Sequence, residues 1–383
     1  MLKLPEGFES YEEARQEGFL KVKALKEKGI PVVGIFCTYT PREIIHAAGA
    51  VAVGLCGTSD EPIPYAEKYL PKNLCPLIKS SYGFAVSDRC PFFYFADLLV
   101  GETTCDGKKK MYEMLNELKP THVMHLPQGQ GVDHAFPYWK EELIRLKERL
   151  EDVFNVKITD DILREEIKKR NRERKILMDF YELGKLNPSP ISGQEISETI
   201  EALDYQFDRM SQCDFISERT KELREKYEKE LKGNGPSRPR ILVTGCPVNG
   251  VRDKVLKIIE DSGADIVAFD NCDGVREKRR LADETKDPMD SLTEKYLNIN
   301  CSVMTPNPGR FRDLGEMIDE YEVDAVIEIV LQACHTFNVE AYNIKKFVTE
   351  EKQKHYLYIE TDYSKLDVGQ INTRVNALLE MIL

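Results

Sequence analysis

The sequence predicts an α/β protein with two parallel-sheet domains and a charged helical segment between them. Strand-like apolar runs alternate with helix-like segments near both ends of the chain, a pattern typical of a parallel sheet flanked by helices. Residues 138–232 are instead heavily charged and helix-periodic, as in "KEELIRLKERLEDVF". The stretch "GNGPSRPR" (Gly233–Arg240) is typical of a linker. We therefore divide the 383 residues into an N-terminal domain at 1–137, a helical segment with its linker at 138–239, and a C-terminal domain at 240–383.

The N-terminal domain is expected to begin with a charged helix at residues 8–29 and to contain four strands. We expect these strands at Pro31–Phe36, Val51–Leu55, Asp97–Val100 and His122–Leu126. Helices are expected at Pro41–Ala48, from about Pro76, and at Lys108–Leu118. Proline is favoured in the first turn of a helix, which supports the first two of these helix starts.

The same alternation restarts after the linker. We expect strands at Ile241–Thr244, Ile266–Phe269, Ala325–Leu331 and Tyr356–Glu360. Helices are expected at Asp253–Ser262, about Asp290–Tyr296 and Gln370–Leu383. Both domains begin with a strand, a cysteine, a turn and a helix, in "GIFCTYTPREII" and "LVTGCPVNGVRDKVL". This shared order indicates a duplicated α/β domain.

Composition excludes several classes of partner. The formal net charge is -12, and no large block of Lys and Arg offers contacts to phosphates, so a nucleic-acid partner is not expected. The first residues lack the apolar core of a signal peptide. No apolar run approaches the roughly 20 residues of a membrane span. We expect a soluble, cytoplasmic protein without a membrane partner.

Ten cysteines are the most informative residues of the chain. A long cytoplasmic protein keeps its thiols reduced, and no CxxC or CxxxC pair is present, so any metal site has to combine distant segments. Many of the cysteines follow predicted strands, where ligands bind in α/β sheets. Those that follow strands are Cys37, Cys56, Cys105, Cys246, Cys272 and Cys334. Position alone leaves both a metal cluster and ordinary buried thiols open.

Several of these cysteines have surroundings that suit an anionic, thiolate-held cluster. Cys75 and Cys105 each directly precede a predicted helix, whose N-terminal N–H groups stabilise negative charge. The basic run Lys108–Lys110 either adds positive charge or forms a solvated helix face. His335, beside Cys334, is a candidate proton donor, and a structural role is the alternative. No Walker A motif is present, so ATP would have to be bound by another polypeptide.

Seven segments together carry a family resemblance. They are "FCTYTPREIIHAAGA", "CPLIKSSYGFA", "DLLVGETTCDGKKKMYE", "NCDG", "CSVMTPN", "QACHTFNVE" and "IETDYS". With them the chain resembles the 2-hydroxyacyl-CoA dehydratase D-component family, and within it most closely the double-cubane cluster protein branch. The resemblance covers nearly the whole chain apart from its charged middle. It implies two flavodoxin-like, doubly wound parallel-sheet domains with a helical segment and an iron–sulfur site between the domains.

The resemblance also implies a set of ligands. Dehydratase subunits hold one [4Fe-4S] cluster on three cysteines, which correspond here to Cys75, Cys105 and Cys334. The double-cubane branch holds an [8Fe-9S] cluster on six cysteines. By motif the set is completed by Cys37, Cys272 and Cys301, the last of which lies in a short extended stretch. Cys246 is the principal rival to these three.

The implied activity is that of an iron–sulfur oxidoreductase. A separate ATP-hydrolysing iron–sulfur activator would reduce the cluster, which would then reduce a small substrate at low potential. One alternative is a 2-hydroxyacyl-CoA dehydratase subunit with a single [4Fe-4S] cluster. A second is an electron-storage or scaffold protein without a substrate of its own. A homodimer is the family expectation.

Overall fold

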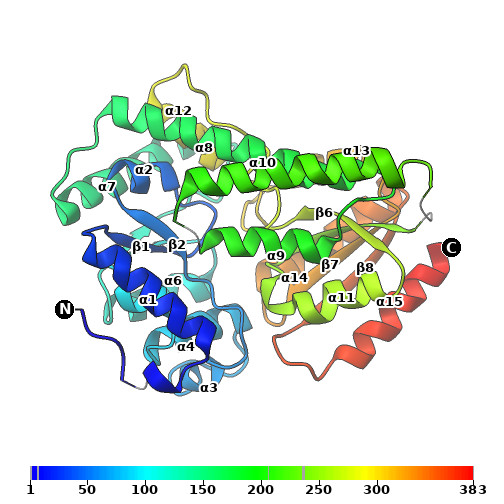
Figure 1. Cartoon of the computed structure of the whole chain (residues 1–383), viewed down its shortest axis with the longest axis horizontal. Helices are drawn as coiled ribbons and strands as arrows, with labels where there is room; N and C mark the ends of the chain where they lie inside the picture. The colour runs from blue at the N-terminus through cyan, green and yellow to red at the C-terminus, as the bar shows by residue number, and fades with distance from the viewer. Residues whose placement is uncertain (1, 7, 206, 235–237, 383) are drawn as a thin grey trace. The chain divides into compact units, whose positions relative to one another are not determined.

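The computed structural model describes residues 2–6, 8–205, 207–234 and 238–382 (Figure 1). The chain folds into two compact units, and each unit is built from two separate stretches of sequence. The first unit contains residues 1–171 and 282–299, and the second contains residues 172–281 and 300–383. The domain boundaries after residues 137 and 239, which were drawn from the sequence, remain a prediction.

The first unit is organised around a four-stranded parallel sheet with the order β2-β1-β3-β4. Its strands are β1 (Val32–Ile35), β2 (Val51–Gly54), β3 (Leu98–Glu102) and β4 (Thr121–Met124). Every residue of β1 and β3 is buried, as expected for central strands of a parallel sheet covered on both faces. The two central strands therefore form the core of this unit.

Helices surround this sheet, and one of them comes from much later in the sequence. The helix α7 packs against α12, which returns to the first unit after a long excursion of the chain. The helical elements of this unit are η1 (Phe8–Ser10), α1 (Glu13–Glu27), α2 (Arg42–Ala47), α3 (Ile63–Ala66), α4 (Pro76–Val86), α5 (Pro91–Phe95), α6 (Asp106–Asn116), α7 (Ala135–Phe154) and α12 (Pro288–Leu297).

The second unit repeats the same sheet. Its strands β5 (Arg240–Gly245), β6 (Asp265–Asp270), β7 (Ala325–Leu331) and β8 (His355–Thr361) are parallel and have the order β6-β5-β7-β8. All seven residues of β7 are buried, including the charged Glu328. The strand order is thus the same in both units, which agrees with the duplicated pattern in the sequence.

The helical elements of the second unit cover its sheet and include part of the charged middle segment. They are η2 (Glu182–Lys185), α9 (Gly193–Asp204), α10 (Arg209–Lys226), η3 (Tyr227–Leu231), η4 (Asn249–Val251), η5 (Arg252–Leu256), α11 (Lys257–Asp261), α13 (Pro308–Glu320), α14 (His335–Lys346), η6 (Phe347–Glu351) and α15 (Val368–Ile382). Helix α8 (Asp160–Tyr181) crosses the division, because the units separate between Asn171 and Arg172.

The predicted fold class is confirmed. Two parallel sheets with a flavodoxin-like strand order are present, and all eight strands overlap their predicted ranges. Residues 138–232 are predominantly helical, as their periodicity indicates. Helices α13 and α14 had no counterpart in the prediction. Residues 235–237 of the predicted linker Gly233–Arg240 lie outside the described residues, and Arg240 already belongs to β5.

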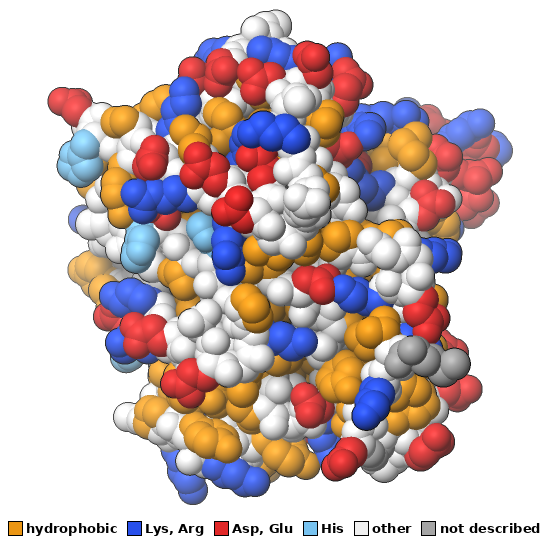
Figure 2. All heavy atoms as spheres, turned by 90° about the vertical axis from the view of Figure 1, so that its left-hand side faces the viewer, with side chains coloured by type: hydrophobic (Ala, Val, Ile, Leu, Met, Phe, Trp, Pro, Cys, Tyr) orange, Lys and Arg blue, Asp and Glu red, His pale blue; other side chains and the backbone are white. Residues whose placement is uncertain are grey.

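Charged side chains are frequent on the surface, as expected for a chain in which 31% of the residues are charged. On the face shown in Figure 2, acidic and basic side chains alternate with hydrophobic ones. Within the described ranges, no helix combines the length and the apolar character that crossing a bilayer requires.

Gly245 is the last residue of the central strand β5, and its replacement is expected to destabilise the protein. Its φ is +105°, and a Cβ built there would lie 2.2 Å from the carbonyl oxygen of Ile329. We expect Gly245→Ala to lower the free energy of unfolding by about 2–4 kcal/mol, because strain and a backbone clash add. Urea unfolding followed by circular dichroism measures this change.

The matched control is Gly54→Ala at the end of β2, where a Cβ would meet open space. This variant should unfold within about 0.5 kcal/mol of the parent protein. Equal stabilities of the two variants would contradict the steric account of Gly245.

Candidate functional site

Three cysteines follow the strands of the first sheet at one edge. Cys37 lies just after β1, Cys56 just after β2 and Cys105 just after β3. The strands are parallel, so their carboxyl ends meet at the same edge of the sheet. β1 and β3 are neighbours although β2 comes between them in sequence, and ligands of α/β sheets bind at such a switch point.

Four cysteines occupy the N-cap positions of helices. Cys75 precedes α4, Cys105 precedes α6 and Cys334 precedes α14, and none of the three side chains makes a capping hydrogen bond. Cys90 differs, because its sulfur caps α5 by accepting the N–H of Phe93 at 3.4 Å. A thiolate at a helix N-terminus is stabilised by the N–H groups and the helix dipole. The first three cysteines therefore have an environment that favours the thiolate.

Lys108 in the first turn of α6 points back toward the cysteines. Its Nζ donates to the carbonyl oxygen of Phe36 at 2.5 Å and lies 3.9 Å from the sulfur of Cys56. Burial lowers the pKa of Lys108, but nearby thiols and Tyr112 outweigh this effect and raise the pKa well above its usual range. The cysteines that do so are Cys56, Cys37 and Cys105. Lys108 is therefore a cation held among the cysteines of the first unit.

Glu102 is a fully buried carboxyl group at the end of β3. Thr40 donates a hydrogen bond to it. Burial raises the pKa of Glu102 to about 7, although Thr40 and Lys108 both act to lower it. This edge of the sheet thus contains an acidic group that titrates near neutral pH.

The second unit also has a cysteine after each of its first three strands. Cys246 directly follows β5, Cys272 lies just after β6 and Cys334 lies just after β7. By strand order these positions match those of Cys37, Cys56 and Cys105, so both sheets have a cysteine-bearing carboxyl edge.

Arg276 is the cation of this second edge. It is 4% exposed, and one guanidinium nitrogen lies 3.9 Å from the sulfur of Cys272. Burial lowers the pKa of Arg276, but Asp270, Cys272 and Cys301 outweigh burial and raise the pKa well above its usual range. Its guanidinium also lies 5.6 Å from the ring centroid of Phe337, in the first turn of α14.

Cys301 and Cys334 are linked through two hydroxyl groups. The sulfur of Cys301 lies 3.9 Å from the hydroxyl of Ser302, which donates to Thr336 at 3.1 Å. The Thr336 hydroxyl in turn lies 4.0 Å from the sulfur of Cys334. The structure therefore brings Cys301 together with Cys334, and Arg276 lies beside Cys272.

A buried charge network supports these residues. Arg310 on α13 is 1% exposed and pairs with Asp270 at 2.7 Å and with Glu340 at 2.6 Å. It also lies 3.9 Å from Glu328 of β7. Burial acts to raise the pKa of Asp270, but Arg276 and Arg310 overcome it and hold the pKa at about 2. Arg310 thus connects the end of β6 and the middle of β7 with α13 and α14.

The remaining cysteines have different surroundings. Cys246 is 2% exposed, and its sulfur accepts the N–H of Leu331 at 3.4 Å inside the sheet. Cys213 is buried on α10, and burial raises its thiol pKa. Cys56 lies at the same sheet edge as Cys37 and close to Lys108. The sequence placed Cys56 after a strand but did not select it as a ligand. No disulfide joins the ten cysteines, all of which lie in the described part of the chain.

His335 is the first residue of α14 and is exposed. It directly follows Cys334, so it lies at the carboxyl edge of the second sheet. The structure does not test its predicted role in proton transfer.

The described residues contain no group of three His, Cys, Asp or Glu side chains close enough to hold a single metal ion. An iron–sulfur cluster spans a wider space than one ion, and its ligands are correspondingly farther apart. The donor set present, which consists of thiols beside helix N-termini and cations, fits such a cluster in its chemistry.

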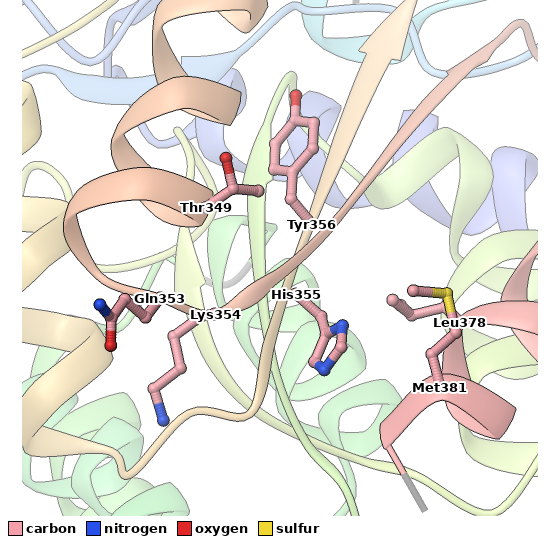
Figure 3. A pocket seen from close by; sticks show the side chains of 7 residues that line it. All are labelled: Thr349, Gln353, Lys354, His355, Tyr356, Leu378 and Met381. Carbon is pink, nitrogen blue, oxygen red and sulfur yellow. The ribbon is translucent and has the colours of Figure 1, made fainter.

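A hollow of about 430 Å³ lies elsewhere on the second unit (Figure 3). Its lining includes Lys354, His355 and Tyr356 at the amino end of β8, together with Leu378 and Met381 of α15. The amino ends of the strands are opposite the edge that carries the cysteines. This hollow is therefore separate from the candidate site.

Comparison with known proteins identifies the family. Residues 37–382 match the family model described as 2-hydroxyglutaryl-CoA dehydratase, D-component. The chain belongs to this family. The resemblance drawn from the sequence motifs is thereby confirmed, and the family consists of dehydratases and related reductase subunits.

Individual relatives agree with this assignment. The chain is 49% identical over 379 residues to "Putative dehydratase subunit YjiM" of Escherichia coli (strain K12), covering 99% of this chain and 98% of that protein. It is 26% identical over 368 residues to the (R)-phenyllactyl-CoA dehydratase beta subunit of Clostridium sporogenes, covering 94% of both chains. It is also 26% identical over 312 residues to a benzoyl-CoA reductase subunit of Thauera aromatica, covering 80% of this chain and 78% of that relative.

Sequence reasoning left the role of the Lys108–Lys110 run open and did not find Arg276. Lys108 belongs to a run of three lysines whose solvated face is the ordinary interpretation. Arg276 lies in "VREKRR", where burial of one arginine leaves no signal in the composition. The signal that could have found both is their spacing, since each comes three or four residues after a cysteine that follows a strand.

Arg310 is expected to be essential for stability. Arg310→Met leaves buried carboxylates without their partner, and loss of one partner from a buried ion pair costs about 3–5 kcal/mol. Urea unfolding should show a loss of this size. Arg312→Met on the same helix is the control, because that side chain is 61% exposed. A loss no larger than the control's would mean that the network does not depend on Arg310.

Proposed function

We propose that this protein is an iron–sulfur oxidoreductase component whose cysteines hold a double-cubane [8Fe-9S] cluster. The six proposed ligands are Cys37, Cys75, Cys105, Cys272, Cys301 and Cys334. Three belong to the first unit and three to the second. The membership in a family of dehydratases and reductases supports an iron–sulfur cofactor of this kind.

One observation carries the choice of six ligands over three. Cys37, Cys272 and Cys301 share their surroundings with cysteines of the three-ligand set. Cys37 and Cys105 both act to raise the pKa of Lys108, while Cys301 is linked through Ser302 and Thr336 to Cys334. Cys272 and Cys301 both act to raise the pKa of Arg276. Five of the six proposed ligands, all but Cys75, are thus related to Lys108, Arg276 or a linked cysteine, which is more than the three that a single cubane uses.

The residues of the chain contribute orientation and charge. Helix N-termini at Cys75, Cys105 and Cys334 favour thiolates. Lys108 and Arg276 add positive charge 3.9 Å from the sulfurs of Cys56 and Cys272. When bound, such a cluster supplies electrons at low potential. His335, exposed at the start of α14, is the proposed proton donor to a small substrate. The Arg310 network keeps the loops that carry Cys272 and Cys334 in place.

The proposal includes partners. An ATP-hydrolysing iron–sulfur activator would deliver the electrons, and the protein would work as a homodimer in the cytoplasm, where thiols stay reduced. The relatives named as beta subunits support the need for further protein components.

A specific observation favours a second candidate, a 2-hydroxyacyl-CoA dehydratase subunit with one [4Fe-4S] cluster. Among the ten cysteines, all of which the structure describes, only Cys75, Cys105 and Cys334 combine a helix N-cap position with a sulfur that makes no capping hydrogen bond. These are the three cysteines that the family resemblance assigns to a single cubane.

Iron content distinguishes the two candidates. We expect an oxygen-sensitive, brown protein with about eight iron atoms per chain after anaerobic reconstitution, whereas about four would favour the dehydratase. Cys105→Ala should lose about half of this iron, because its cubane loses a ligand. Cys90→Ala and Cys213→Ala should keep all of it. A colourless wild-type protein, or equal losses in Cys213→Ala and Cys105→Ala, would contradict the assignment.

The source of energy is a separate prediction. The chain alone should neither bind nor hydrolyse ATP, because its sequence has no Walker A motif. Substrate reduction should require the activator and ATP together. The measurement is ATP hydrolysis and product formation with each component alone and with both mixed. ATP cleavage by this chain in isolation would overturn the two-component scheme.

A further inference from the structure

Lys108 is the one lysine of its run that faces the cysteines. Lys109 and Lys110 are exposed and form ion pairs along α6, with Asp106 at 2.8 Å and with Glu113 at 2.7 Å. Lys108 instead donates to the carbonyl oxygen of Phe36, the residue that directly precedes Cys37. Three neighbouring lysines therefore have two different roles, and only the first bears on the cysteine edge.

Arg276 occupies a comparable place in the second unit. It is buried, and its guanidinium donates to the backbone carbonyl of Asp270 at 2.9 Å. The distance from its nitrogen to the sulfur of Cys272 is 3.9 Å, the same as from Lys108 to Cys56. Arg279, three residues later, pairs with Glu316 and Glu320 on α13. Each unit thus places one cation against a cysteine at its carboxyl edge.

Placing a cation inside a protein is costly unless it meets a negative charge. Arg276 is the more loosely paired of the two buried arginines. It lies 3.4 Å from Asp270, whereas Arg310 lies 2.7 Å from Asp270 and 2.6 Å from Glu340. Lys108 has Glu102 nearby, but that carboxyl has a pKa of about 7 and is only partly ionised near neutral pH. Both cations therefore have charge available for a further anionic group.

We infer that Lys108 and Arg276, each beside a cysteine at the carboxyl edge of its own sheet, are positioning residues that offset the negative charge of thiolate-held iron–sulfur and raise its reduction potential. The inference rests on the proposed function, since it requires a bound cluster. Reduction adds one electron and makes the cluster more negative. A fixed positive charge stabilises the reduced form more than the oxidised form, and this difference raises the potential. Removal of either charge should make reduction harder.

The test is an anaerobic redox titration of the reconstituted full-length protein. Titanium(III) citrate serves as the reductant, and electron paramagnetic resonance follows the reduced cluster. The variants are Lys108→Gln and Arg276→Gln, with Lys108→Arg and Arg276→Lys as charge-conserving partners. Lys109→Gln and Arg279→Gln are matched controls from the same two basic runs. Iron content and thermal unfolding are measured for each protein.

We expect both Gln variants to keep their iron and to show a more negative midpoint potential than wild type. The double variant should shift further than either single one. Charge-conserving variants and controls should titrate like wild type. Loss of iron in Lys108→Gln but not in Lys108→Arg also supports the inference, because charge distinguishes these two. Where a Gln variant does not fold, Lys108→Met or Arg276→Met replaces it.

Three results would count against these proposals, and they distinguish a failure of the proposed function from a failure of this inference. An iron-free wild-type protein overturns the proposed function and with it this inference. Iron-loaded Gln variants with the wild-type potential overturn the inference alone. Equal shifts in Lys108→Gln and Lys108→Arg also count against it, since packing and not charge would then be responsible.

Discussion

Parallel strand pairing is the constraint on which the rest of the structure depends. A parallel sheet brings all strand ends of one kind to one edge, and the chain returns between them through helices. Residues far apart in sequence, such as Cys37 and Cys105, therefore share an edge without any local motif. The same constraint orients the helices after the strands, so that the N-termini of α6 and α14 lie where β3 and β7 end. Thiols and helix dipoles meet at this edge as a result of topology.

Charge is the second level of organisation, and it is concentrated in the interior. Arg310, Arg276 and Asp270 lie beneath the cysteine edge of the second sheet, where isolated charges would be unstable. Their mutual pairing makes burial acceptable and fixes the loop that begins at Asn271. The first unit has no counterpart of comparable extent among its described residues, and there Lys108 relies on a backbone carbonyl and neighbouring thiols. The two sheets thus have the same topology and different electrostatic support.

Much of the fold could be predicted from the sequence because strands buried on both faces form continuous apolar runs. The run Ala325–Leu331 gave β7 its observed bounds for this reason. Helix α14 was missed, since "HTFNVEAYNIKK" mixes polar and apolar residues and begins at a cysteine instead of a usual N-cap residue. The positions of the cysteines after strands followed from the sequence. The direction of the Lys108 side chain toward the cysteines could not be predicted in this way. It depends on the hydrogen bond to the carbonyl oxygen of Phe36, which lies after β1 and far from Lys108 in sequence.

The interleaving of the two units has a consequence for how the chain is made. The first unit is incomplete until α12, which packs against α7, has been synthesised. During synthesis on the ribosome, the face of α7 that packs against α12 therefore stays uncovered while more than one hundred residues of the other unit are added. At common synthesis rates, adding these residues takes about ten seconds. A single cut between α10 and β5 would separate no intact unit, since each fragment would keep pieces of both. The two sheets share one topology, yet each unit is interrupted in sequence by part of the other, so neither can be separated from the chain as one continuous fragment.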